Sequence, residues 1–214
     1  MNETGIVPYK FNLKKEFTRF FLIFALILFI LFFFIMNPRF LTYSNIMNIL
    51  RNMAVMAMMS IAAMFVMMVG ELNFGLGAEA TLAAAIIGYL CSIRQMPGYG
   101  IAFMITVLLM MGVAFVNSRF TCYLGVPAFI ATLAASKLWD ALIYQLTGGQ
   151  TFYSSQWTDA FIVIGQGYIG PIPNLLIGMV IMVALGWIVL ERTRLGRHIQ
   201  AVGGNTTAAL QVGI

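Results

Sequence analysis

The chain has 214 residues, of which 61% are hydrophobic and only 9% are charged, and its mean hydropathy is +0.93. A soluble domain carries roughly 25% charged residues, so this composition excludes a water-soluble globular protein and indicates one that spans a lipid bilayer. The formal net charge of +5 does not indicate nucleic-acid binding. The basic residues stand at the ends of apolar segments, whereas a nucleic-acid binder gathers them on a soluble face.

Six apolar segments are candidates for membrane-spanning helices, each of which needs about 20 predominantly apolar residues. The first, residues 20–36, follows a basic stretch and lacks the small-residue cleavage site of a signal peptide, so we expect an uncleaved helix. The later segments are residues 46–69, 78–93, 101–117, 127–146 and 175–190. The sequence therefore predicts an all-α polytopic membrane protein with about six transmembrane helices.

The distribution of Lys and Arg predicts how these helices are oriented. If every segment crosses, eight basic residues lie on one side, three lie on or near the other, and Lys137 falls within a span. Cytoplasmic segments carry the excess of Lys and Arg, so we expect residues 1–19 and 191–214 to be cytoplasmic and residues 20–190 to form the transmembrane domain. The eight are Lys10, Lys14, Lys15, Arg19, Arg119, Arg192, Arg194 and Arg197, and the three are Arg39, Arg51 and Arg94.

Residues 147–174 form the longest predicted external segment. Their glycines and prolines favour turns and one short surface helix over a separate domain.

The junction between the second and third spans is unusually polar and rich in glycine. Residues 70–79 contain three glycines, two glutamates and Asn73. Glycine weakens a helix, and charged groups at membrane depth are costly. Two interpretations remain open: a tight interfacial turn whose acids face the cytoplasm, or a broken helix beside a transport path.

Two further groups of polar residues lie within predicted spans. Asn45, Asn48 and Asn52 share one face of the second span and either line a hydrated path or bind a neighbouring helix. Lys137 and Asp140 lie three residues apart in the fifth span, where each can neutralise the other. They form either a buried ion pair that fixes helix packing or a polar contact along the path, and in both cases we expect both side chains to face protein instead of lipid.

Nothing in the sequence indicates catalysis, a metal site or a bound cofactor. His198 is the only histidine, and Cys91 and Cys122 are expected to be small buried hydrophobes. No Gly-x-Ser-x-Gly motif of serine hydrolases is present. The chain also lacks a phosphate-binding Gly-x-x-x-x-Gly-Lys-Ser/Thr loop, so it is not expected to bind ATP in that manner.

The last cytoplasmic segment predicts a short helix between membrane spans. Asn205 is a good N-cap, residues 206–212 make about two turns, and Gly213 is a natural stop. Ala208 and Ala209 are small enough to let the surface of another protein approach closely. An ordinary interfacial helix would show the same pattern.

Four stretches, in order, make the sequence resemble the permease family of bacterial ABC importers for ribose, xylose, arabinose and similar sugars. Residues 40–42 (FLT) and 45–51 (NIMNILR) resemble the entry into that family's second span, and residues 70–78 (GELNFGLGA) resemble its Gly-Gly-Ile-Asp-Leu-Ser-Val-Gly-Ser motif. Residues 125–133 (GVPAFIATL) and 146–150 (LTGGQ) resemble its fifth span and the following loop. Residues 193–214 resemble its cytoplasmic coupling loop, with matches at Gly203, Asn205, Ala208, Ala209, Gly213 and Ile214.

The resemblance implies a multi-pass protein of the bacterial plasma (inner) membrane, surrounded by lipid and importing a monosaccharide or similar small polar solute. It implies three partners: a separate ABC ATPase subunit, an external sugar-binding protein that largely sets selectivity, and a second permease copy or homologue. We expect coupling to the ATPase through Gly203, Asn205, Ala208 and Ala209. We expect the substrate path to include Asn48, Asn52, Glu71 and Asn73.

The sequence departs from the family pattern in three respects. Asn73 stands where the family usually has Asp, Gly75 where it has Ser, and Asp140 is unexpected at its position. The resemblance stops at the coupling loop, whereas family members continue for several more spans, so we expect a C-terminally truncated permease.

Two alternative functions remain. An ion-coupled secondary transporter is favoured by the intramembrane charges of Glu71, Glu79, Lys137 and Asp140. The other alternative is a permease fragment that does not transport.

Overall fold

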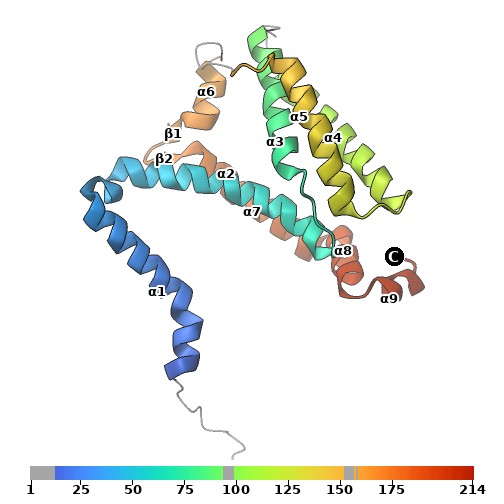
Figure 1. Cartoon of the computed structure of the whole chain (residues 1–214), viewed down its shortest axis with the longest axis horizontal. Helices are drawn as coiled ribbons and strands as arrows, with labels where there is room; N and C mark the ends of the chain where they lie inside the picture. Colours follow the sequence, from blue (N-terminus) through green and yellow to red (C-terminus); the bar gives the residue numbers. More distant parts are fainter. Residues whose placement is uncertain (1–12, 94–98, 152–156, 158) are drawn as a thin grey trace, which may run out of the picture. The chain divides into compact units, whose positions relative to one another are not determined.

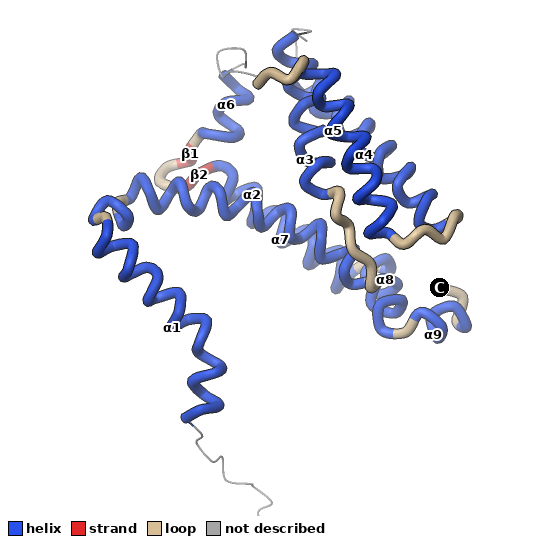
Figure 2. The backbone as a smooth tube through the Cα atoms, viewed as in Figure 1, coloured by secondary structure: helices blue, strands red, loops and turns tan. Residues whose placement is uncertain are grey.

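The protein is almost entirely helical in the computed structural model, which describes residues 13–93, 99–151, 157 and 159–214 (Figures 1 and 2). The predictions for Lys10 and Arg94 lie outside the described residues. The chain forms two compact units, Met1–Ile49 and Leu50–Ile214.

The first unit contains α1 (Leu13–Met36), a 3-10 turn η1 (Pro38–Leu41) and the beginning of α2 (Tyr43–Met68). Asn37 caps η1 by accepting a hydrogen bond from the Arg39 amide at 3.0 Å. Asn45 donates a side-chain hydrogen bond to the Phe40 carbonyl at 2.7 Å, and the Phe33 and Phe40 rings stack with centroids 5.4 Å apart. These contacts fix the corner between the first two helices.

The second unit contains a cluster of three helices, α3 (Leu76–Gly88), α4 (Tyr99–Cys122) and α5 (Ala128–Thr147), in which α3 packs against both others. A π turn, η2 (Tyr89–Ile93), continues α3. Four of the eight buried apolar residues in the described part of the chain belong to α3, more than to any other helix: Leu82, Ala85, Ile86 and Ile87. This helix is therefore the centre of the cluster.

The second unit also contains residues 50–68 of α2 and the elements that follow α5 in the chain. These elements are α6 (Asp159–Gln166), a hairpin of β1 (Tyr168–Ile169) and β2 (Ile172–Pro173), α7 (Asn174–Arg192), α8 (Arg194–Gly204) and α9 (Thr206–Gln211). The α7 helix packs against α6 and α8. Gly186 of α7 is buried, and a side chain there would meet Ile61 of α2 at 3.1 Å. A glycine at this position allows α7 to approach α2 closely.

Most large apolar side chains among the described residues are exposed, whereas alanines make up five of the eight buried apolar residues, an unusual pattern for a soluble protein. Ala54 and Ala102 have no exposed surface, whereas Leu22 and Ile35 are 79% and 78% exposed. Helices packed in lipid approach one another through small residues because lipid is as apolar as their large side chains. The burial pattern thus agrees with the composition.

Every predicted span coincides with a helix, namely α1, α2, α3 with η2, α4, α5 and α7. Among the described residues, α2, α4 and α7 are long and apolar enough to cross a membrane. Residues 20–36 and 76–91 form shorter apolar helices. The short helix in the external segment is present as α6, while the β1–β2 hairpin and α8 were not predicted.

Candidate functional site

The junction between α2 and α3 leaves helical geometry through a defined turn. The Glu71 amide donates to the Val66 carbonyl at 3.3 Å, and the Gly70 amide donates to the Met67 carbonyl at 3.0 Å. Gly70 has a φ of 85°, in the left-handed region that favours glycine. This is the Schellman pattern that ends many helices, so the sequence of α2 itself encodes the break.

Four polar side chains then hold the junction against the three-helix cluster. Nδ2 of Asn117, on α4, donates a hydrogen bond to Oε1 of Glu79 at 2.9 Å. Nδ2 of Asn73 donates to Oε2 of the same carboxylate at 3.5 Å. Thr132 of α5 accepts a hydrogen bond from the Phe74 amide at 3.1 Å. We call Asn73, Glu79, Asn117 and Thr132 the Glu79 cluster.

The Glu79 cluster is largely shielded from solvent. Asn117 and Thr132 are 8% and 5% exposed, and Glu79 is half-buried. Within the described part of the chain, the only ion pair joins Lys137 to Asp140, so amide donors alone bind the Glu79 carboxylate there. A carboxylate that is partly withdrawn from water depends on such donors for its hydrogen bonds, which makes the cluster sensitive to loss of either amide.

Gly75 lies at the centre of this arrangement. Its amide donates to Oδ1 of Asn73 at 2.7 Å. A Cβ atom at position 75 would lie 3.0 Å from the Thr132 carbonyl oxygen, 3.1 Å from Oδ1 of Asn73 and 3.2 Å from Oε1 of Glu79. The close approach of these oxygens explains why glycine stands where the resembled motif has serine.

The predicted path residues are not all brought together. Asn73 belongs to the Glu79 cluster, and Glu71 is exposed in the turn before it. Asn48 and Asn52 are exposed on α2. Asn52 precedes the end of α2 at Met68 by about 24 Å of helix, at ~1.5 Å per residue. Asn52 therefore lies far, along α2, from the α2–α3 junction that contains Asn73.

The predicted coupling residues do lie together, on α8 and α9. Asn205 accepts a hydrogen bond from the Ala208 amide at 2.9 Å, which confirms it as the N-cap of α9. Gly213 has a φ of 79° and follows the helix, as expected. Ala208 is exposed, whereas Ala209 is 4% exposed and packs within the chain. Of the two alanines, only Ala208 offers a surface to another protein.

Gly203 contacts the chain itself. A Cβ atom at this position would collide with the Met68 carbonyl oxygen, at the end of α2. The α8 helix begins where Thr193 accepts a hydrogen bond from the Gly196 amide at 3.2 Å. Gly203 thus places α8 against the residues that lead into the α2–α3 junction.

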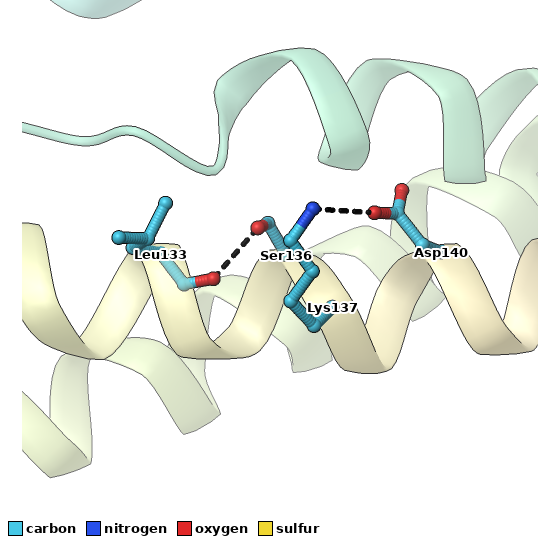
Figure 3. Close-up of polar contacts among 4 residues, drawn as sticks. All are labelled: Leu133, Ser136, Lys137 and Asp140. Atoms are coloured by element: carbon cyan, nitrogen blue, oxygen red, sulfur yellow. Dashed lines mark hydrogen bonds and ion pairs between the residues drawn. The ribbon is translucent and has the colours of Figure 1, made fainter.

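Lys137 and Asp140 form the predicted ion pair on α5, with 3.3 Å between Nζ and Oδ2 (Figure 3). Their side chains are 77% and 53% exposed in this chain. The interpretation of a buried pair is therefore wrong for the chain by itself. Neighbouring Ser136 is buried and donates to the Leu133 carbonyl at 2.7 Å (Figure 3).

A long-range contact between α2 and the segment that precedes α7 was not predicted from the sequence. Nη2 of Arg51 donates to the Tyr168 hydroxyl at 2.5 Å and to the Gln166 carbonyl at 3.4 Å. Its guanidinium also lies 5.0 Å from the centroid of the Tyr168 ring. Arg51 thereby joins α2 to the β1–β2 hairpin, a partner that no local sequence signal identifies.

Within the described residues, no three His, Cys, Asp or Glu side chains are grouped so that they could hold a metal ion.

Comparison with known families gives a match over most of the chain. Residues 45–214 match the model of the family described as branched-chain amino acid transport system / permease component. The chain is 33% identical over 194 residues to the ribose import permease protein of Haemophilus influenzae, and this alignment covers 89% of the chain and 59% of that protein. No solved structure matches the chain.

Other curated relatives show the same coverage. The ribose import permease protein of Bacillus subtilis is 29% identical, over 84% of the chain and 55% of that protein. The autoinducer 2 import system permease protein of Photorhabdus luminescens is 27% identical, over 84% of the chain and 53% of that protein. The chain thus spans between half and three-fifths of the length of these relatives.

Proposed function

Because the chain belongs to the family of branched-chain amino acid transport system permease components, we propose that it is a membrane-spanning permease subunit of an ATP-driven importer for a monosaccharide or similar small polar solute. The observation that carries this proposal is the 33% identity to a ribose import permease over 89% of the chain. The apolar helices and the burial of small residues support a multi-pass protein of the inner membrane.

The proposed importer has three further components. A separate ATPase subunit supplies the energy, an external binding protein delivers the solute, and a second permease copy or homologue completes the path. The chain contributes no catalysis in this scheme. The excess of Lys and Arg in the segments on the N-terminal side of the membrane supports a cytoplasmic N-terminus.

The α8–α9 segment is the proposed contact with the ATPase. Ala208 is exposed on α9, and Asn205 fixes the start of that helix. Gly203 brings α8 against Met68, so a displacement of α9 reaches the α2–α3 junction through packed backbone. We assign Ala208 to the ATPase interface, Asn205 and Ala209 to the shape of α9, and Gly203 to the link with α2.

Asn73 and Glu71 are the proposed polar residues of the path at the α2–α3 junction, and Asn48 and Asn52 are those farther along α2. The exposure of Asn48, Asn52 and Glu71 in this chain supports contact with solute or with another subunit. Their separation along α2 fits a path that crosses the membrane better than a single binding site.

The test is affinity purification of the tagged, full-length protein from detergent-solubilised native membranes, followed by mass spectrometry. An ATPase and a sugar-binding protein should accompany it. Ala208→Arg should remove the ATPase because a bulky cation replaces a methyl group at the interface, while the matched control Ala208→Ser should retain it. A folded wild-type sample that brings down neither partner would refute the proposal.

Uptake by cells separates this proposal from an ion-coupled secondary transporter. Import of radiolabelled D-ribose should stop when ATP is depleted and continue when ion gradients are collapsed. The opposite dependence would establish the secondary transporter.

A further inference from the structure

A cavity of about 580 Å³ in the second unit is lined by α3, the C-terminal half of α5, residues 149–151, Trp157 and Phe161 of α6. Sites for small ligands span ~300–1,000 Å³, so the size suits a single small solute. We call this space the α3–α5 cavity.

The wall of the α3–α5 cavity combines flat aromatic rings with hydrogen-bonding groups. Tyr144, Trp157 and Phe161 contribute the rings, and Trp157 and Phe161 stack with centroids 4.6 Å apart. Asp140 and Gln150 contribute a carboxylate and an amide. A monosaccharide presents both an apolar C–H face and a rim of hydroxyls, and the two kinds of wall group match these two surfaces.

The loop after α5 is built so that this wall can form. Gly148 and Gly149 have φ values of 62° and 74°, which turn the chain back at the end of α5. A Cβ atom at position 149 would lie 2.9 Å from the Tyr144 ring, so only glycine lets the ring lie against the loop. The backbone N–H of Gln150 then donates to the Thr147 carbonyl at 3.2 Å, and Gln150 lines the cavity together with Tyr144.

The charged pair on α5 shows that this side of the helix does not face lipid. Lys137, Asp140, Tyr144 and Thr147 recur every three or four residues and therefore share one helical face. Two charged side chains that are 77% and 53% exposed on a membrane helix must meet water or protein, because contact with lipid is costly. Tyr144 and Thr147 line the cavity together with Asp140, so the cavity lies on the hydrated or protein-covered face.

Asp140 also retains an acceptor for a ligand. Its Oδ2 pairs with Lys137, and within the described residues its Oδ1 makes no hydrogen bond. The ion pair orients the carboxylate, while Oδ1 remains available to accept a hydrogen bond from a sugar hydroxyl. This gives Asp140, which the family resemblance leaves unexplained, a specific role.

We propose that the α3–α5 cavity is a monosaccharide site on the import path, in which Asp140 and Gln150 bind hydroxyls and Tyr144 and Trp157 pack against the C–H face of the sugar. This proposal rests on the proposed importer function and assigns it a solute-binding site. A neighbouring cavity of about 400 Å³, lined by Leu82, Leu142 and other mainly apolar residues, lacks the carboxylate and serves as an internal control.

The experiment measures binding directly, in the purified full-length protein with Trp139→Phe and Trp187→Phe, so that Trp157 is its only tryptophan. Titration with D-ribose, D-xylose and L-arabinose should give a saturable change in Trp157 fluorescence with at least one sugar. Asp140→Asn and Tyr144→Ala should each weaken binding by about tenfold or more, the effect of losing a charged hydrogen bond or a packed ring. Leu142→Ala, in the other cavity, should leave the affinity unchanged.

The Lys137→Gln variant distinguishes whether Asp140 contacts the sugar or only stabilises the protein through its ion pair with Lys137. If Asp140 binds the sugar, this variant retains most of the affinity, and adding it to Asp140→Asn does not restore binding. Equal losses in both single variants with recovery in the double variant would show that the ion pair is only structural and would overturn the assignment. Melting curves identify any variant that fails to fold, in which case Gln150→Ala provides the deciding measurement at a position outside the helices.

The binding assay tests the proposed site, and the uptake assay tests the proposed importer function, so either proposal can be refuted without the other. No saturable response to any of the three sugars, or a response unchanged by Asp140→Asn and Tyr144→Ala, overturns the site even if cells import the sugar. A response that depends on these residues supports the site even in cells that show no ATP-dependent uptake, a result that would instead count against the importer function.

Discussion

Gly203→Ala tests whether α8 is held against α2 by the absence of a side chain. The added methyl group would overlap the Met68 carbonyl oxygen, which belongs to backbone and cannot turn aside. Overpacking of this kind costs about 1–3 kcal/mol. Alanine recovers about 0.5–1 kcal/mol of helix propensity. We therefore expect Gly203→Ala to destabilise the protein by up to about 2.5 kcal/mol.

Gly204→Ala is the matched control. It lies in the same helix, and a Cβ atom there has no neighbour within 4 Å. The same chemical change should therefore leave stability unchanged or raise it by up to about 1 kcal/mol. Thermal melting of the two purified variants in one detergent compares them directly, and Gly203→Ala should have the lower midpoint.

The same pair separates two roles for Gly203. If it links α8 to α2, Gly203→Ala should reduce uptake while the ATPase still co-purifies, in contrast to Ala208→Arg, which should lose the ATPase. A Gly203→Ala protein that melts at or above the midpoint of Gly204→Ala would show that the close contact with Met68 does not exist, and the reasoning would fail.

Three further predictions concern the α2–α3 junction and the hairpin. Gly75→Ala should lower stability by about 1–3 kcal/mol, measured by melting, because three oxygens surround the new methyl group; Gly77→Ala, with open space around it, should not. Glu79→Ala should lower the free energy of unfolding by about 1–3 kcal/mol, because it leaves the Asn117 amide unpaired. Glu79→Gln keeps an acceptor for that amide and should lower it less. Equal melting midpoints of the two variants would contradict this. Arg51→Met should speed amide hydrogen exchange in the β1–β2 hairpin by severalfold and leave α4 unchanged; unaltered hairpin exchange would show that the contact does not hold it.

The spans and the cap of α9 could be predicted because their signals are local. Hydropathy alone locates the six apolar helices that were predicted as spans. The Asn205 cap and the Gly213 stop depend on residues within one or two helical turns. The i,i+3 pairing of Lys137 with Asp140 is equally local. Its exposure was not predictable, since that depends on which other helices cover α5.

The Glu79 cluster could not be predicted because its members are distant in sequence. Asn117 lies 38 residues from Glu79, and Thr132 lies 58 residues from Phe74. Such pairs depend on how three helices pack, which periodicity does not specify. The α8 helix was missed for a related reason: its glycines indicate a break locally, but Gly196 and Gly203 are there to permit close approach to backbone.

These glycines connect the two candidate sites physically. Gly203 packs α8 against Met68, and Gly70 ends α2 two residues later. The next residues enter the Glu79 cluster, where Gly75 lets Asn73, Glu79 and Thr132 close around the backbone. Because the Gly203 contact is with the backbone of Met68, side-chain rotation at this point cannot absorb a shift of α8. It must either move the α2–α3 junction or break the Gly203 contact, and this is the physical basis for placing energy coupling in this part of the chain.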